Sequence, residues 1–197
     1  MKGYHIYIPN YTIGTDCYKE IPWVTRKYGK KAVVIGGKTA MSKAKDALLD
    51  GIDGSDVEIT DFVWYGGEAS YENAEELMKM DAVKDADMIF AVGGGRVMDT
   101  CKVVKEKLDK PMFTFPTIGS NCAATTSIAV IYHPDGRVNN YFYSKTPAEH
   151  IFINTKIIAE SPENLFWAGI GDAISKELEA QLSIRGHKVS HTPLMGN

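Results

Sequence analysis

The chain has 197 residues, of which 44% are hydrophobic, and a formal net charge of −3 at pH 7. This size and composition suffice for one hydrophobic core and the start of a second domain. The charges form no basic block and the longest apolar runs are far too short to cross a bilayer, so nucleic acid and membranes are excluded as the main partners.

Short β-branched runs alternate with polar, periodic segments through the first half of the chain, which is the pattern of β-α-β units. The predicted elements are strand 31–35, helix 41–49, strand 57–64, helix 70–80, strand 87–92, helix 96–108 and strand 112–115. Helix 96–108 has its apolar residues close to a 3.6-residue period. The order predicts an α/β fold with a Rossmann-like parallel sheet.

The pattern then changes to two strand-like runs, 127–132 and 138–143, around the sequence His133-Pro134-Asp135-Gly136. Proline presets φ and glycine accepts the left-handed position, so this sequence predicts the turn of an antiparallel hairpin. A last short strand is expected over 151–153.

The remaining predicted elements are helical. Ser161 is a helix cap with Pro162 at the first position, and 173–184 is expected to form another helix. We therefore divide the chain into an α/β domain over 1–160 and the start of an all-helical domain over 161–197. Because the chain stops at Asn197, directly after this helical stretch, we expect the second domain to be truncated.

The glycine triplet Gly93-Gly94-Gly95 lies where a hydrophobic strand gives way to a helix. Without Cβ atoms the backbone approaches a pyrophosphate closely, and the free N–H groups of the helix start bind it. A tight turn without a ligand is the alternative, and the spacing is not G-x-G-x-x-G. Asp99 either compensates the helix dipole or orders the glycine loop.

Two further segments carry polar groups at informative places. Residues 116–127, Pro-Thr-Ile-Gly-Ser-Asn-Cys-Ala-Ala-Thr-Thr-Ser, follow a parallel strand, where they either bind a ligand or form an ordinary polar loop. Asp172 lies within the otherwise apolar segment 167–174. A buried carboxylate needs a cation or several hydrogen bonds, and the alternative is a helix cap.

In series, the segments 93–102 (Gly-Gly-Gly-Arg-Val-Met-Asp-Thr-Cys-Lys), Pro116-Thr117 and 168–173 (Ala-Gly-Ile-Gly-Asp-Ala) closely resemble the iron-containing (group III) alcohol dehydrogenases. The similarity is to their glycerol dehydrogenase and hydroxycarboxylate dehydrogenase branch, and it extends from the first strand to about residue 184. It implies an N-terminal nucleotide-binding domain, a C-terminal helical domain, and a divalent zinc or iron ion between them.

The resemblance also implies site residues by position. Asp172 is a metal ligand in the second domain, and the histidine ligands of the family lie beyond Asn197. No catalytic residue is assigned. The predicted contacts of the nicotinamide nucleotide, including those taken from local sequence, are Lys38, Gly93, Gly94, Gly95, Arg96, Asp99, Thr117, Ser120, Thr126, Ile128 and Tyr132.

Two positions depart from the glycerol dehydrogenase pattern. Cys122 stands where those enzymes have an Asp that touches the substrate hydroxyls, so glycerol is in doubt and an anionic substrate is favoured. Asn121 and Cys122, the predicted substrate-binding residues, resemble the hydroxycarboxylate members instead. Lys38 follows the glycines where the family often has an Asp facing the ribose. A lysine there pairs with a 2′-phosphate and favours NADP(H), or it is a solvated surface residue.

The five histidines supply no family ligand. His5, His133 and His150 are interpreted as structural or exposed. His187 and His191 have the i,i+4 spacing that presents two imidazoles to one metal on a helix, but Gly186 and Pro193 interrupt that helix.

These observations predict an NAD(P)-dependent and metal-dependent oxidoreductase that interconverts a small alcohol or 2-hydroxy acid and its carbonyl form. The metal polarises the substrate oxygen while hydride moves to or from the nicotinamide. The alternatives are a polyol dehydrogenase, a lyase similar to dehydroquinate synthase, and a non-catalytic nucleotide-binding module, which is how the truncated chain alone should behave. The absence of a signal pattern and three cysteines without CxxC spacing predict a cytoplasmic protein, and a homo-oligomer is left open.

Overall fold

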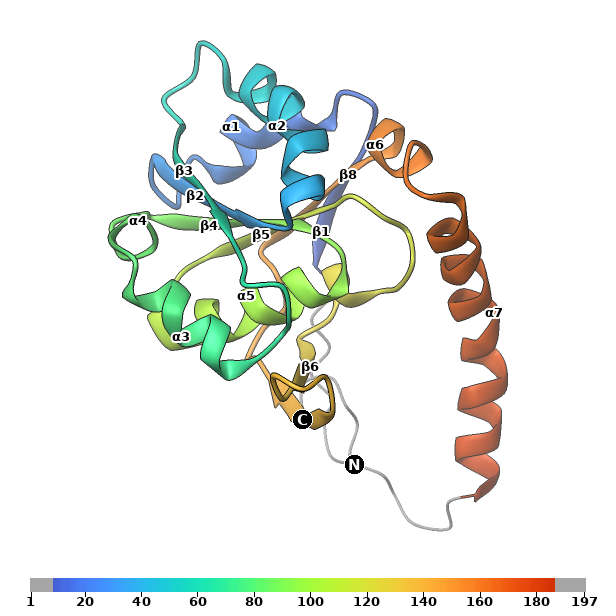
Figure 1. Cartoon of the computed structure of the whole chain (residues 1–197). Helices are drawn as coiled ribbons and strands as arrows, with labels where there is room; N and C mark the ends of the chain where they lie inside the picture. Colours follow the sequence, from blue (N-terminus) through green and yellow to red (C-terminus); the bar gives the residue numbers. More distant parts are fainter. Residues whose placement is uncertain (1–8, 187–197) are drawn as a thin grey trace, which may run out of the picture.

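The computed structural model describes residues 9–186 (Figure 1). Its main sheet has six parallel strands in the order β1-β8-β5-β4-β2-β3. The strands are β1 (Asn10–Gly14), β2 (Lys31–Gly36), β3 (Glu58–Trp64), β4 (Met88–Gly93), β5 (Met112–Pro116), β6 (Ile128–Tyr132), β7 (Val138–Tyr143) and β8 (His150–Asn154). The predicted Rossmann-like parallel sheet is confirmed.

Helices connect the strands and cover both faces of this sheet. They are η1 (Cys17–Glu20), α1 (Ile21–Thr25), α2 (Lys38–Ile52), α3 (Tyr71–Lys79), α4 (Asp81–Lys84), α5 (Gly95–Leu108), η2 (Ala123–Thr125), α6 (Thr155–Ala159) and α7 (Glu163–Gly186). In Figure 1, α1 and α2 lie on one side of the sheet, and α3 and α5 lie on the other.

The core consists of two layers because alternate side chains of a strand point to opposite faces. On β2, Ala32 and Val34 pack with α1, α2 and η1, whereas Val33 and Ile35 pack with α3 and α5. All four are fully buried, which explains why this strand reads as a continuous apolar run in the sequence.

The strand order creates a switch point between β2 and β4. Helix α2 leads from β2 outward to β3, and α5 leads from β4 in the opposite direction to β5. In open α/β sheets the crevice at the carboxyl ends of two such strands is where ligands bind. Both strands end in glycines here, at Gly36 and Gly93.

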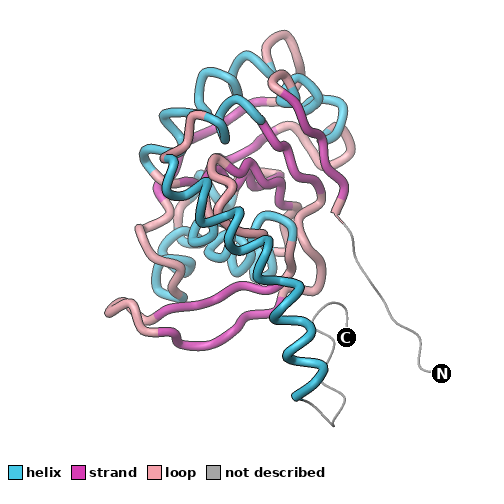
Figure 2. The backbone as a smooth tube through the Cα atoms, turned by 90° about the vertical axis from the view of Figure 1, so that its right-hand side faces the viewer, coloured by secondary structure: helices cyan, strands magenta, loops and turns pink. Residues whose placement is uncertain are grey.

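Strands β6 and β7 form the predicted antiparallel hairpin as a separate two-stranded sheet (Figure 2). Gly136 in the turn has a φ of +83°, the left-handed conformation expected of it. Ala129 and Ile131 of β6 are buried against the core, while Ile128, Val130 and Tyr132 are half-buried on the other face.

Several short elements at the edge of the sheet formed by β1 and β8 were not predicted. Strand β1 is a mostly exposed edge strand paired with β8, so it has no buried apolar run that would reveal it. Helix α6 follows Asn154, whose Oδ1 accepts hydrogen bonds from the N–H groups of Lys156 and Ile157. An asparagine at the end of a strand is a helix-start signal that was overlooked.

The C-terminal prediction of two helices is wrong, since α7 is continuous. It begins at Glu163, where the carbonyl of Pro162 accepts the N–H of Leu165 at 2.9 Å, and the buried hydroxyl of Ser161 makes no capping bond. Gly169 does not end the helix because its missing side chain allows close packing: a Cβ there would lie 1.7 Å from the carbonyl oxygen of Gly119.

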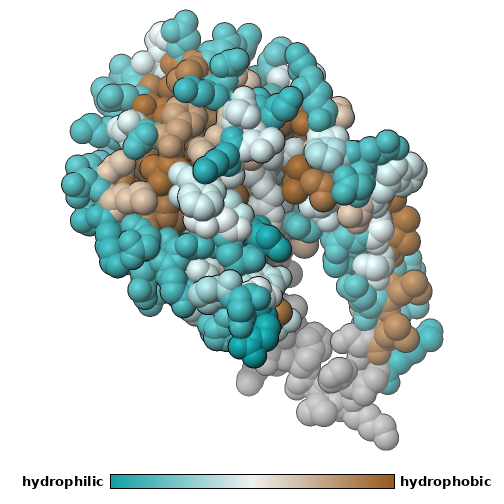
Figure 3. All heavy atoms as spheres, viewed as in Figure 1, coloured by the Kyte–Doolittle hydropathy of each residue, from teal (hydrophilic) through white to brown (hydrophobic). Residues whose placement is uncertain are grey.

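Helix α7 also exposes an apolar stripe, with residues spaced by four so that they share one face. Figure 3 shows these apolar side chains along the helix. They are Phe166, Ile170, Ile174, Leu178 and Leu182. Within residues 9–186, no helix is long and apolar enough to span a membrane.

Candidate functional site

The glycine triplet connects β4 to α5 and lies directly against the 117–122 loop. Gly93 has a φ of +153°, and a Cβ there would lie 2.8 Å from Cγ2 of Val97. Gly94 is the extended residue before the helix, and a Cβ there would lie 2.5 Å from Cδ1 of Ile118. The N–H of Thr117 donates to the carbonyl of Gly93 at 3.1 Å. The triplet is therefore a closely packed βα turn at the switch point.

A cavity of about 430 Å³ opens beside this turn. Gly94 and Thr117 line it from the sheet, and residues of the first turns of α2 line it from above. Its walls are mostly apolar, as in sites that accept an adenosine. Thr39, Ala40 and Lys43 of α2 were missed by the sequence prediction, although the start of a helix after the first βα turn is where such contacts are expected.

A second cavity, of about 450 Å³, brings together the predicted substrate-binding and metal-binding residues. Asn121 and Cys122 line it from the loop, and Asp172 with Lys176 lines it from α7. The cavity exists because α7 approaches the loop at Gly169, where the backbone of Gly119 leaves no room for a side chain. Residues about fifty positions apart in the sequence thus face one space.

Asp172 lies in the interior of α7, so the alternative role of a helix cap is wrong. Its side chain is 34% exposed, and Oδ1 lies 2.9 Å from Nζ of Lys176. The carboxylate is therefore only partly buried, so the sequence argument from burial does not apply, and a lysine one turn later pairs with it at the surface. Lys176 was missed, although its i+4 spacing from Asp172 is a recognisable signal.

Asp99 faces the hairpin and not the glycine loop. Its Oδ1 lies 3.0 Å from Nζ of Lys102, and its Oδ2 accepts the N–H of Val130 at 3.1 Å. Burial lowers the pKa of the Lys102 ammonium and raises the pKa of Asp99, and each charge opposes the shift of the other. Asp99 thus connects α5 to β6, and the alternative that it orders the glycine loop finds no contact in the described residues.

The other predicted nucleotide contacts lie in the glycine turn, in the loop after β5 and near β6. The guanidinium of Arg96 pairs with Glu68 at 3.2 Å, and the amide of Asn121 lies 3.5 Å from the hydroxyl of Ser120. Thr126, Ile128 and Tyr132 lie at the start and along the half-buried face of β6.

Lys38 is the first residue of α2, and its Nζ stacks over the Trp64 ring at 4.7 Å from the centroid.

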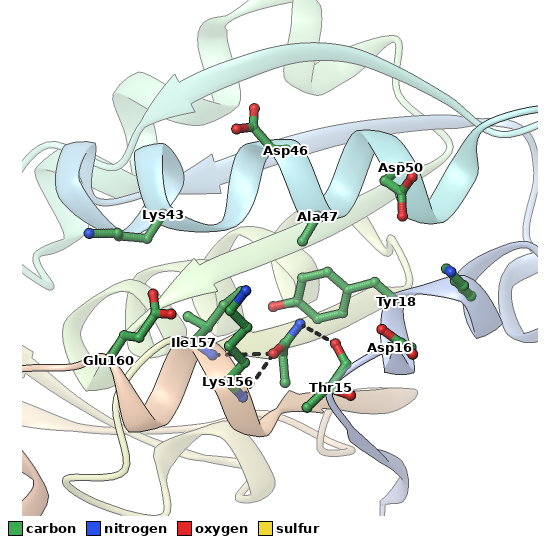
Figure 4. A pocket seen from close by; sticks show the side chains of 12 residues that line it. Thr15, Asp16, Tyr18, Lys43, Asp46, Ala47, Asp50, Lys156, Ile157 and Glu160 are labelled. Atoms are coloured by element: carbon green, nitrogen blue, oxygen red, sulfur yellow. Dashed lines mark hydrogen bonds between the residues drawn. The ribbon is translucent and has the colours of Figure 1, made fainter.

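A third cavity, of about 350 Å³, continues past α2 toward the end of β1 (Figure 4). It shares Lys43, Ile157 and Glu160 with the first cavity. The buried hydroxyl of Tyr18 borders it and has no hydrogen-bond partner among residues 9–186. No sequence pattern pointed to this space, because its lining comes from three separate segments of the chain.

The described part of the chain contains no group of three or more His, Cys, Asp or Glu side chains placed to hold a metal ion. His187 and His191 lie outside the described residues. His150 lies on β8, where its Nε2 is 2.7 Å from Oγ1 of Thr12 on β1, and His133 follows β6 at the hairpin turn. Their predicted structural and exposed positions are consistent with these contacts.

Comparison with known proteins identifies the family. Residues 9–154 match the family described as iron-containing alcohol dehydrogenase. Glycerol dehydrogenase 1 of Schizosaccharomyces pombe is 33% identical over 168 residues, which are 85% of this chain and 36% of that protein. Hydroxycarboxylate dehydrogenase A of Escherichia coli is 30% identical over 152 residues, which are 76% of this chain and 40% of that protein.

Solved structures agree with this assignment. The crystal structure of the glycerol dehydrogenase from Schizosaccharomyces pombe superposes with a TM-score of 0.82 at 31% identity, covering 94% of this chain and 47% of that one. The chain spans about a third to a half of the length of these relatives and corresponds to their N-terminal part. The family match over most of the chain, the parallel sheet with its hairpin and the glycine turn at the switch point agree, and the chain belongs to the iron-containing alcohol dehydrogenase family.

Proposed function

We propose that this chain is the nucleotide-binding part of an NAD(P)-dependent and metal-dependent dehydrogenase for a small alcohol or 2-hydroxy acid. The observation that carries the proposal is the glycine turn beside an apolar cavity at the switch point, with Gly94 and Thr117 in its wall. Titration of the chain with NADH and NADPH, followed by the fluorescence of the reduced nicotinamide, tests it. Absence of saturable binding would contradict it.

The residues present would hold a dinucleotide at three places. The pyrophosphate lies at residues 93–95, where the first N–H groups of α5 are free to bind it. The adenosine occupies the cavity beneath α2, beside Thr39 and Ala40. The nicotinamide extends toward Thr126 and Ile128 at the base of the hairpin. When bound, it supplies the hydride acceptor or donor of the reaction.

The residues described do not by themselves fit a metal ion. Asp172 is the one ligand that the family resemblance assigns to this chain, and Lys176 pairs with it. Zinc and iron sites use three or more protein ligands. The other ligands of a zinc or iron centre therefore have to come from outside residues 9–186.

The second cavity is proposed as the substrate pocket. Asn121 supplies an amide, and Cys122 supplies an exposed thiol in place of a carboxylate. Lys176 also lines the pocket, where its ammonium pairs with the carboxylate of Asp172, so these two charges cancel and the pocket is not acidic. A pocket with this charge distribution accepts the carboxylate of a 2-oxo or 2-hydroxy acid more readily than an acidic one does. A polyol substrate is the second candidate, because several relatives are named glycerol dehydrogenases.

We further propose that residues 1–160 form the nucleotide-binding domain and that 161–197 begin a helical metal-binding domain. The exposed apolar stripe of α7 supports this division, since such a stripe is typical of a helix that packs against others. We also propose a cytoplasmic location, on the basis of cysteines that form no disulfide in the described residues.

Replacing Lys38 with Asp is expected to change the ratio of NADPH to NADH affinity by about tenfold in favour of NADH, through the lost pairing with the 2′-phosphate and the added negative charge. The ratio of the two dissociation constants is the measurement. Lys45→Asp is the matched control and should leave the ratio unchanged, because Lys45 lies on the same helix, its Nζ stacks over the Phe62 ring, and it does not line the cavity. An unchanged ratio in Lys38→Asp would show that Lys38 is a surface residue stacked on Trp64.

A further inference from the structure

Helix α5 carries a buried ion pair two turns after the glycine turn. Lys102 is 1% exposed and Asp99 is 8% exposed, and Nζ lies 3.0 Å from Oδ1. A buried ion pair contributes little net stability compared with apolar residues of the same volume, because both charges lose their hydration. A role for this ion pair is therefore better sought in the backbone groups that it binds than in the stability of the fold.

The pair binds the backbone of β6. Nζ of Lys102 donates to the carbonyl of Ile128 at 2.5 Å, and the N–H of Val130 donates to Oδ2 of Asp99 at 3.1 Å. Backbone groups of alternate residues point to the same edge of a strand, so both bonds lie on the edge of β6 away from β7. The two side chains replace the third strand that an otherwise two-stranded, marginally stable sheet lacks.

We propose that Lys102 and Asp99 are positioning residues for the nicotinamide half of the nucleotide. The proposal rests on the proposed function, in which residues 93–95 bind the pyrophosphate and the start of β6 meets the nicotinamide. Nζ of Lys102 also donates to Oγ1 of Thr126 at 3.2 Å, so the ammonium orients one of the predicted nicotinamide contacts directly. One helix thus begins at the pyrophosphate and, two turns later, fixes the strand that receives the ring.

The chain provides a matched control in Lys105, on the same helix three residues later. It is 6% exposed, and its Nζ donates to the carbonyl of Thr146 at 2.9 Å and to that of Pro147 at 2.7 Å. These acceptors belong to the segment before β8, which contains no predicted nucleotide contact. Replacing Lys105 therefore removes an ammonium that is buried like that of Lys102, but it removes no hydrogen bond to β6.

The test compares binding of NADH with binding of ADP-ribose, which lacks the nicotinamide ring, in Lys102→Met, Lys105→Met and the unchanged chain. Lys102→Met is expected to lower the affinity for NADH about tenfold, because hydrogen bonds to one half of the ligand are lost. The affinity for ADP-ribose should stay within about twofold. Lys105→Met should change both ligands equally or neither. Hydrogen exchange of the Val130 amide should accelerate in Lys102→Met alone.

An equal loss for both ligands in Lys102→Met, or an unchanged NADH affinity, would overturn the proposal. If Lys102→Met does not fold, the double variant with Asp99→Asn removes the unpaired buried charge, and the same selective loss is expected of it. If the unchanged chain binds neither ligand, the proposed function fails, and exchange at Val130 then decides separately whether the pair fixes β6.

Discussion

Gly94→Val is expected to lower nucleotide affinity about a hundredfold, equivalent to about 2.7 kcal/mol of binding free energy. A Cβ at Gly94 lies 2.5 Å from Cδ1 of Ile118, so the branched side chain displaces Ile118 or enters the cavity beside it. Either outcome removes the close approach of a pyrophosphate to the backbone of the α5 start. The backbone of Gly94 is extended, with a φ of −104°, so valine introduces no backbone strain. Titration with NADH measures the loss.

Gly171→Ala is the control for this substitution. Gly171 lies on α7 with open space around its Cβ position, so alanine there should leave nucleotide affinity unchanged. Thermal unfolding of Gly94→Val should show that the fold persists, because the change is confined to the turn between β4 and α5. Wild-type affinity in a folded Gly94→Val chain would mean that the triplet is only a tight turn.

The sequence predicted the elements whose side chains are buried on both faces of the sheet. Runs such as residues 32–35 and 88–92 are apolar throughout because helices cover both faces, and this makes them recognisable without a structure. Strand β1 escaped because it lies at an exposed edge, where no apolar run is required. The continuous α7 escaped because two glycines normally indicate a break, whereas Gly169 is retained for a close approach to Gly119.

The residues of the candidate site also differ in how far the sequence predicted them. Residues on one short segment, such as the glycine triplet, were found from local pattern alone. Asp99 was predicted as a site residue, but its role was not. One of its two partners, Val130, lies on a strand about thirty residues later in the sequence. Asp172 was expected to be buried and to need a cation, but its side chain is 34% exposed and pairs with Lys176 at the surface.

Zinc or iron added to the 197-residue chain is expected to leave no stoichiometric metal bound after dialysis, and the chain is expected to show no alcohol-dependent reduction of NAD(P). The reason is the number of ligands. Such sites take three or more protein ligands, and Asp172 is the one candidate that this chain contributes by family resemblance. Its pairing with Lys176 adds a competing cation to be displaced. Metal analysis of the dialysed protein is the measurement.

Asp172→Ala separates metal binding from nucleotide binding. In the 197-residue chain it should leave nucleotide affinity within about twofold, because Asp172 lines the cavity with Cys122 and not the one with Gly94. In a chain that also carries the histidine ligands of the family, the same change should abolish metal binding and turnover. A tightly bound ion in the 197-residue chain would contradict this account and restore His187 and His191 as ligands. Their replacement by alanine should then release the metal, whereas Asp172→Ala alone should not.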